Sequence, residues 1–210
     1  MPDAARRLIL LRHGRTAWNA ERRAQGHTDV CLDELGRAQA AAVAPTLAEL
    51  QPATLRTSDL ARARETVAPV EAATGLTALS DARLREYDLG ERTGMTMPEY
   101  AAAFPDEYAA FRQGRYEVVP GGESTAAVVT RVTAALRDAL ADLAAGECGV
   151  VVSHGGALKV SLLALLGWPG ELAAALRGLD NCAWAEVDDS GGGGALRLVA
   201  YNRTTGFRPA

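Results

Sequence analysis

The sequence has few thiols and no long apolar run. The three cysteines, Cys31, Cys148 and Cys182, are odd in number and far apart, and no two of them have the CxxC spacing. A disulfide framework is therefore not expected, and a reducing cytoplasm is the compartment that fits. No stretch reaches the roughly 18 apolar residues that a membrane-spanning helix needs. The apolar segment near the start is too short for a secretory signal.

Lysine is almost absent as well. Lys159 is the only one, so nearly all positive charge is arginine, and the net charge is −4 with no basic run. Such a chain is not expected to bind nucleic acid. No GxGxxG follows an apolar run, which excludes the usual dinucleotide fingerprint. The carboxylate clusters that magnesium uses are missing too, so no metal and no cofactor are expected.

What the sequence does contain is typical of a soluble globular protein. Its 210 residues are 48% hydrophobic and 23% charged, enough to build a sizeable core. No internal repeat and no linker-like segment interrupts the chain. We therefore expect a single domain over residues 1–210.

Short apolar runs alternate with helix-like segments along most of the chain. Strands are expected at 8–11, 54–57 and 149–152, and helices at 34–50, from about 59 to 74, as two short pieces between 97 and 112, from 124 onward, and from 155 to 166. Near the end, 182–187 and 196–201 read as a hairpin whose loop tip is the glycine run 191–194. This order predicts an α/β fold, a three-layer α/β/α sandwich with a mostly parallel sheet and an antiparallel edge.

The helices also carry predictions about their buried faces and their ends. The buried face of the first long helix is expected to contain Ala38, Ala41, Ala42, Leu47 and Leu50, and that of the helix after Ser124 to contain Val128, Val132, Leu136, Leu140 and Leu143. Ser58 or Asp59 is expected to cap the second long helix, and Gly75 to end it.

Two of the three histidines follow directly on a predicted strand. The first strand leads into Arg12, His13 and a glycine, and the third leads into His154 and two glycines. In open α/β sheets, ligands bind outside the carboxyl ends of the strands. Arginine offers a planar donor fork, glycine exposes its N–H, and histidine is either a nucleophile or a donor to an oxyanion. Together these residue types suit a phosphoryl dianion.

Six segments in order resemble the motifs of the histidine phosphatase superfamily, whose fold is called phosphoglycerate mutase-like. They are LRHGRTAWN, GHTDVCLDELGRAQA, SDLARARET, LREYDLGERTG, GGES and VVSHGG, and they extend from about residue 8 to 160. The resemblance implies a metal-independent phosphomonoesterase that acts through a phosphohistidine. Its expected substrate is a small phosphorylated metabolite such as a glycerate or sugar phosphate.

The resemblance also implies a role for each residue that matches a motif. His13 is expected to be the nucleophile, Arg12, Arg62 and His154 to hold the phosphoryl oxygens, and Glu86 to protonate the leaving oxygen. Phosphate contacts are expected from Asn19, Gln25, Gly26 and the backbone of Gly155. Positioned cations meet the main demand of phosphoryl transfer, and a carboxylic acid meets the need of a poor leaving group.

Two alternatives remain open at this stage. A cofactor-dependent phosphoglycerate mutase would continue the acidic motif with cations, whereas Tyr87 and Asp88 follow Glu86 here; a non-catalytic phosphate-binding module would lack part of the motif set. The sequence does not decide whether Glu123 caps a helix or lines the pocket, or whether His27 touches substrate. Nor does it show whether Arg15 or Arg92 faces a substrate carboxylate. A homodimer is compatible with the sequence.

Overall fold

The structure is a computed structural model that describes residues 4–112, 119–191 and 195–207. Its centre is one six-stranded sheet with the order β3-β2-β4-β1-β5-β6. The strands are β1 (Arg7–Arg12), β2 (Thr54–Thr57), β3 (Leu79–Ser80), β4 (Cys148–Ser153), β5 (Trp184–Asp188) and β6 (Arg197–Arg203). The first four run parallel, and β5 and β6 pair antiparallel on one side. The predicted mostly parallel sheet with an antiparallel edge is confirmed.

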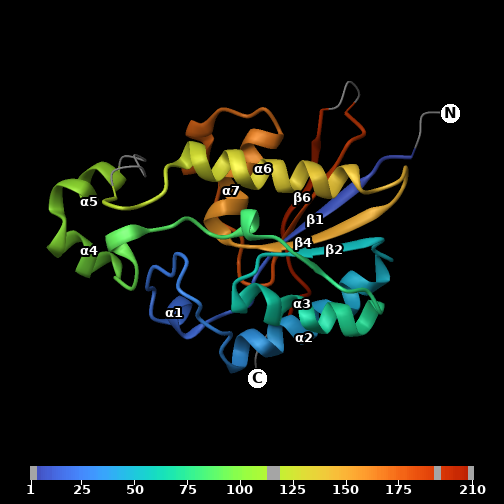
Figure 1. Ribbon diagram of the computed structural model, residues 1–210, viewed down its shortest axis with the longest axis horizontal. Helices are drawn as coiled ribbons and strands as arrows, with labels where there is room; N and C mark the ends of the chain where they lie inside the picture. Colours follow the sequence, from blue (N-terminus) through green and yellow to red (C-terminus); the bar gives the residue numbers. More distant parts are fainter. Residues whose placement is uncertain (1–3, 113–118, 192–194, 208–210) are drawn as a thin grey trace.

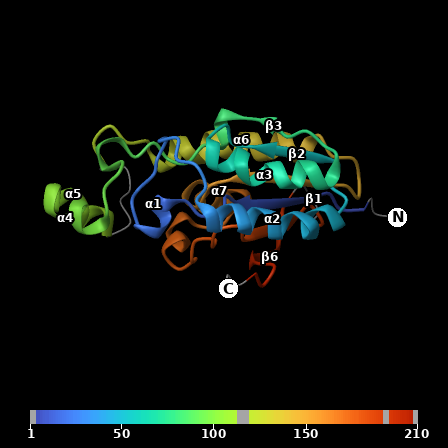
Figure 2. The same cartoon turned by 90° about the horizontal axis from the view of Figure 1, so that it is seen from below.

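Helices cover both faces of the sheet (Figures 1 and 2). The long ones are α2 (Glu34–Glu49), α3 (Ala61–Thr74), α6 (Thr125–Ala141) and α7 (Gly155–Leu165). Leu8 and Leu10 of β1 point into the core under α6 and α7, whereas Ile9 and Leu11 point into the core under α2 and α3. A strand buried on both faces is expected to be an unbroken apolar run, as β1 is. The three-layer α/β/α sandwich is therefore confirmed.

The buried face of α6 agrees with its prediction better than that of α2 does. Along α6 the predicted Val128, Val132 and Leu136 are buried. Along α2 the buried residues are Gly36, Ala40, Val43, Ala44 and Leu47, so the prediction for Leu47 is confirmed, whereas the placement of Ala38 and Ala41 was wrong because both are exposed. Alanine occurs on both buried and exposed faces of helices, so the spacing of alanines does not identify the buried face of α2. The large aliphatic residues of α6 do identify its buried face.

The predicted cap of α3 is also wrong. Its N-cap is Leu60, whose side chain makes no capping bond, and the Ala61 N–H donates instead to Asp29 Oδ1 at 2.5 Å. A carboxylate from a distant loop thus takes the place of a local cap. The predicted end of this helix is confirmed, because Gly75 has the left-handed φ of 74° that favours glycine.

Smaller elements lie beside and beyond the carboxyl edge of the sheet. They are α1 (Ala17–Ala20), the 3₁₀ turns η1 (Ala82–Leu84), η2 (Gly90–Arg92) and η4 (Gly170–Ala174), and the short helices α4 (Met97–Ala103) and α5 (Pro105–Arg112). The pair α4 and α5 projects to one side of the sandwich in both views (Figures 1 and 2). Two short helices separated at Pro105 were predicted and are confirmed.

Three further predictions concern the chain as a whole. Within the described ranges, no helix is long and apolar enough to cross a membrane. The three cysteines are unpaired, with Cys31 exposed and the other two buried. The hairpin of β5 and β6 is confirmed, but residues 192–194 of its predicted glycine loop lie outside the described residues.

Candidate active site

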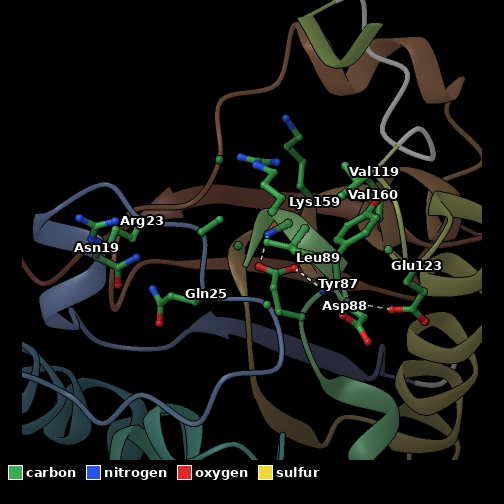
Figure 3. A pocket seen from close by; sticks show the side chains of 18 of the residues that line it. Asn19, Arg23, Gln25, Tyr87, Asp88, Leu89, Val119, Glu123, Lys159 and Val160 are labelled. Carbon is green, nitrogen blue, oxygen red and sulfur yellow. Dashed lines mark hydrogen bonds between the residues drawn. The ribbon is translucent and has the colours of Figure 1, made fainter. Parts of the chain in front are cut away.

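A cavity of about 420 Å³ opens at the carboxyl edge of the parallel strands (Figure 3). The neighbouring strands β1 and β4 end together there, because Arg12 pairs with Ser153 and the His13 N–H donates to the Ser153 carbonyl at 3.0 Å. The two histidine segments predicted to meet therefore do so. The ring centroids of His13 and His154 lie 5.2 Å apart. The sheet register is what brings residues 141 positions apart into contact.

His13 lines the cavity with its tautomer fixed. Its Nδ1 lies 2.7 Å from the Gly14 carbonyl oxygen, and since a carbonyl only accepts, Nδ1 carries the proton and Nε2 keeps a lone pair. Burial, together with the charges of Arg12 and Arg62, lowers the pKa of His13 well below its ordinary value. The imidazole is therefore neutral near pH 7 and chemically a nucleophile.

Two arginines, Arg12, which is partly buried, and Arg62, which is fully buried, also line the cavity. Arg12 donates from Nη1 to the Leu179 carbonyl at 2.6 Å, while its buried Nε has no hydrogen-bond partner among the described residues. Arg62 is fully buried and donates to the carbonyl oxygens of Gly26 and Thr28, each at 2.8 Å. Desolvation lowers the pKa of both guanidinium groups, that of Arg62 to about 10, so both remain charged at neutral pH.

His154 lies one layer behind the cavity wall. Arg62 Nε–H donates to its Nδ1 at 3.1 Å, which leaves the proton on Nε2, and that N–H lies 2.9 Å from Ser58 Oγ. The ring is completely buried and is not among the lining residues. Burial and the Arg62 charge lower the pKa of His154 well below its ordinary value. The structure thus places His154 against Arg62 and His13, with both ring nitrogens already hydrogen-bonded.

The Glu86 carboxylate lies at the N-terminus of α7. It accepts hydrogen bonds from the N–H groups of Gly156 at 2.9 Å, Ala157 at 2.8 Å and Tyr87 at 3.0 Å. Helix N-termini attract anions because the first N–H groups have no partner within the helix. Gly156 is what permits this approach, since a Cβ there would lie 2.7 Å from Glu86 Oε1. The backbone N–H of Gly155, the first of this helix, has no partner among the described residues.

A partly buried ion pair holds the backbone of the Glu86 segment. Arg131 of α6 binds both oxygens of Glu123 at 2.7 Å and donates to the Glu86 carbonyl at 2.8 Å. Nε2 of His27 lies 2.8 Å from the same carbonyl oxygen. The open question about Glu123 is thereby answered, because it lines the cavity while Ser124 provides the helix cap. Arg131 was missed in the sequence, where it is one of many arginines on a helix.

The remaining predicted phosphate contacts surround the same cavity. Asn19 Oδ1 is held by donors from Thr16 and Asn181, which leaves its Nδ2 without a partner among the described residues. Gln25 is buried and lines the cavity, and its Oε1 makes no hydrogen bond in the described part of the chain. Gly26 has a left-handed φ of 52° and presents its carbonyl, rather than its N–H, to Arg62.

The structure separates the two arginines considered for a substrate carboxylate. Arg15 pairs with Asp33 at 2.7 Å and does not line the cavity. Arg92 does line it, and its guanidinium stacks 4.3 Å from the centre of the Phe111 ring. In the part of the chain that the structure describes, no three histidine, cysteine or acidic side chains converge to hold a metal ion.

Fold and cavity together define an α/β protein with a neutral histidine and two arginines in one cavity at the carboxyl edge of its sheet. Comparison with known families agrees with this class. The chain belongs to the histidine phosphatase superfamily, branch 1, whose model matches residues 8–202.

Individual relatives share both the sequence and the fold. The chain is 38% identical to a glucosyl-3-phosphoglycerate phosphatase of Mycolicibacterium vanbaalenii, over 87% of this chain and 84% of the relative. It is 42% identical to phosphoglycerate mutase-like protein 4 of Arabidopsis thaliana, over 72% and 67%. A solved structure of mycobacterial glucosyl-3-phosphoglycerate phosphatase with VO3 superposes with a TM-score of 0.87 at 36% identity, covering 95% and 100% of the two chains. These findings confirm the predicted phosphoric monoester hydrolase.

Proposed function

We propose that this chain hydrolyses a small phosphomonoester through a phosphohistidine formed on His13. The observation that carries the proposal is the His13 imidazole, which is neutral, fixed by the Gly14 carbonyl and close to the charges of Arg12 and Arg62. A nucleophile of this kind divides one difficult displacement into two easier ones.

In the first step, Nε2 of His13 attacks phosphorus and the bond to the leaving oxygen breaks. Charge develops on the equatorial phosphoryl oxygens, where preorganised cations and N–H donors contribute most. Candidates for these contacts are the unpartnered Nε of Arg12, the Asn19 amide, the N–H of Gly155 and the spare donors of Arg62. His154 supports Arg62 from behind and stabilises charge that every substrate develops.

Glu86 supplies the proton that the leaving alkoxide needs. A carboxylate has about four lone-pair directions, and three are used by backbone N–H groups, so one remains for a proton. In the second step water attacks the phosphohistidine, Glu86 takes back a proton, and inorganic phosphate leaves. The same residue thus serves as acid and then as base.

The substrate class proposed is a glycerate or a glycosylated glycerate phosphate. Two observations support it. The relatives named above include glucosyl-3-phosphoglycerate phosphatases, and the cavity has room and positive charge beyond Arg12 and Arg62. A sugar phosphate without a carboxylate is the alternative that a substrate panel tests.

The experiment that tests the function is transient labelling with a phosphomonoester carrying ³²P. Acid-labile, base-stable label is expected in the wild type and is expected to vanish in His13→Ala, while the control Arg137→Met, exposed on α6, keeps it. Label of equal size in His13→Ala would refute the role of His13. Conversion of 3-phosphoglycerate to 2-phosphoglycerate without release of phosphate would favour the mutase alternative.

We further propose that residues 1–210 form a single domain that works in a reducing cytoplasm. One sheet joins strands from both ends of the chain, which supports the first point. Three free cysteines, two of them buried, support the second.

A further inference from the structure

Lys159 is a cation that the chain places in the cavity wall without a partner. It lies in α7, lines the cavity and is only partly exposed. Its ammonium group makes no hydrogen bond or ion pair with any residue that the structure describes. Some other charges near the site are paired: Arg23 binds Glu99 at 2.8 Å, and Arg131 binds Glu123 at 2.7 Å. In Figure 3 no dashed line ends on the Lys159 side chain.

An unpaired, partly buried ammonium group is costly for the free protein. Burial lowers the pKa of Lys159, and no anion among the described residues offsets the desolvation. Lysines that only cover apolar surface usually keep the charged end in water. Here the Lys159 side chain belongs to the lining of the cavity that also contains Arg12, His13 and Arg62. The arrangement is explained if a bound molecule brings the missing negative charge.

The position of Lys159 relative to the phosphoryl site follows from the helix. Gly155, Gly156, Lys159 and Val160 form the face of α7 that lines the cavity. Gly155 packs against Arg12, since a Cβ there would lie 3.2 Å from Arg12 Nε. Lys159 is one turn further along, a rise of about 6 Å. Its ammonium group is therefore suited to a group on the substrate some atoms away from the phosphorus.

We infer that Lys159 binds a second anionic group of the substrate, a carboxylate carried by the same small molecule as the phosphate. Lys159 is thus a specificity-determining residue that favours esters of hydroxy acids over neutral polyol or sugar phosphates. The inference rests on the proposed function for its choice of substrate. Binding of a carboxylate by Lys159 does not require turnover, so binding measurements test it independently of the proposed function.

The first experiment compares two esters that differ in one group. 3-Phosphoglycerate has a carboxylate where glycerol 3-phosphate has a hydroxymethyl group. In Lys159→Met the ratio of their kcat/KM values should fall about 10- to 100-fold toward glycerol 3-phosphate, mainly through KM, as expected for loss of a charge-assisted hydrogen bond. Lys159→Arg should restore most of the ratio, and Arg137→Met, which removes a charge from exposed surface, should leave it unchanged.

Two results of this comparison would overturn the inference. One is that kcat/KM in Lys159→Met is unchanged for both esters, which would mean that Lys159 does not contact the substrate. The other is an equal fall in kcat/KM for both esters, which would assign Lys159 to the phosphoryl group or to the fold. The melting temperature of Lys159→Met distinguishes a role of Lys159 in the fold from a role in binding the phosphoryl group.

The second experiment measures ligand binding, so its result is informative even if the proposed hydrolysis does not occur. His13→Ala and His13→Ala/Lys159→Met are titrated with 3-phosphoglycerate and with glycerol 3-phosphate. The added substitution should weaken only the first ligand, again about 10- to 100-fold. If wild-type protein hydrolyses neither ester yet this difference in binding holds, the proposed function fails while the carboxylate subsite stands. If His13→Ala binds neither ester, or both are weakened equally, the subsite is wrong.

The composition provides a third measurement on the unmodified chain. Because Lys159 is the only lysine, an amine-directed acylating reagent has only this side chain and the terminal amine to modify. Peptide mass spectrometry should show that 3-phosphoglycerate protects Lys159 and that glycerol 3-phosphate does so far less. Equal protection by both ligands contradicts the inference.

Discussion

Among single residues, Glu86 has the surroundings with the clearest chemical consequence. Its carboxylate is fixed by three backbone N–H groups at the start of α7, and its backbone carbonyl is held by His27 and Arg131. A side chain anchored at both ends is well placed for a proton transfer that tolerates little misplacement. Two predictions at this scale separate its role from those of its neighbours.

The first prediction concerns the leaving group. Glu86→Gln should slow phosphorylation by an alkyl phosphate about 10²- to 10⁴-fold, the usual weight of general acid catalysis. It should slow phosphorylation by p-nitrophenyl phosphate far less, because nitrophenolate leaves without a proton. Single-turnover formation of the phosphoenzyme is the measurement, since in the proposed mechanism Glu86 also takes part in hydrolysis of the intermediate.

His154→Ala is the comparison for that experiment. Its loss should slow both esters alike, because it stabilises charge through Arg62 rather than donating to the leaving oxygen. Leaving-group dependence in His154→Ala, or its absence in Glu86→Gln, would reverse the two assignments.

The second prediction concerns a substitution that displaces the Glu86 carboxylate without replacing Glu86. A Cβ in Gly156→Ala would meet the Glu86 carboxylate at 2.7 Å, and the flexible carboxylate, not the backbone, is what would shift. Activity on alkyl phosphates should fall at least about 10-fold, with a melting temperature close to that of the wild type. Gly170→Ala, whose Cβ would meet open space, is the control. Full activity of Gly156→Ala would show that the position of Glu86 is not critical.

The third prediction also belongs to single residues, because cations here occupy the place that a metal often takes. Arg12 and Arg62 lie beside the nucleophile, and no cluster of metal ligands exists among the described residues. Treatment with EDTA should therefore leave phosphatase activity within about twofold, judging by the charge that the arginines supply. Loss of most activity, restored by a divalent ion, would contradict this.

At the scale of elements, the instructive case is α6, which carries Arg131 beneath the Glu86 segment. Arg131 donates to the carbonyl oxygens of Arg83, Arg85 and Glu86 while it pairs with Glu123. A helix from one layer thus binds three carbonyl oxygens of a loop whose side chains are held elsewhere, as Glu86 is by α7 and Arg85 is by Asp59. Arg131 is a positioning residue for Glu86, because it binds the backbone of the loop and leaves the carboxylate itself to α7.

The fourth prediction tests this link through non-additivity. Arg131→Met should lower the alkyl phosphate rate about 10-fold and show the same leaving-group dependence as Glu86→Gln. In a Glu86→Gln background, Arg131→Met should lower the rate little further, since the effects of substitutions in residues that act as one unit are not additive. Arg137→Met on the same helix is the control. Additive effects would mean that Arg131 supports the fold alone.

The elements also show what could be predicted from the sequence. Strand ends, the α6 face and the glycine end of α3 follow from local rules that tertiary contacts do not override here. The α2 face and the α3 cap do not, because alanine spacing is uninformative and Asp29 reaches Ala61 from a loop. The residues around the nucleophile were found by motif, whereas Arg131 and the partners of His154 depend on packing between layers.

At the scale of the whole molecule, two buried neutral histidines tie stability to pH. The pKa values of His13 and His154 are lowered in the folded state, chiefly by burial, so below the ordinary histidine pKa of about 6.5 the unfolded chain binds more protons. Stability is therefore fully present above about pH 6.5 and declines as pH falls through the window down to the lowered values.

The fifth prediction states the size of that decline. Between pH 6.5 and 5.5 the free energy of unfolding should fall by up to about 1 kcal/mol per histidine, as measured by urea unfolding. Carboxylates with lowered pKa values, such as Asp59 and Glu123, become protonated at more acidic pH, so they do not contribute to the change in stability between pH 6.5 and 5.5. A His13→Asn/His154→Asn variant should lose most of this slope. An equal slope in the variant would place its origin elsewhere.

The two margins of the sheet have a consequence for the protein in concentrated solution. On one margin β3 has only two residues, and on the other β6 pairs with register shifts and contains Asn202 in a left-handed conformation with φ of 53°. Exposed strands that are long and flat recruit further chains and start fibrils, whereas short or irregular ones do not. Storage at high concentration should therefore not produce fibrils through this sheet, and loss of material should follow unfolding instead.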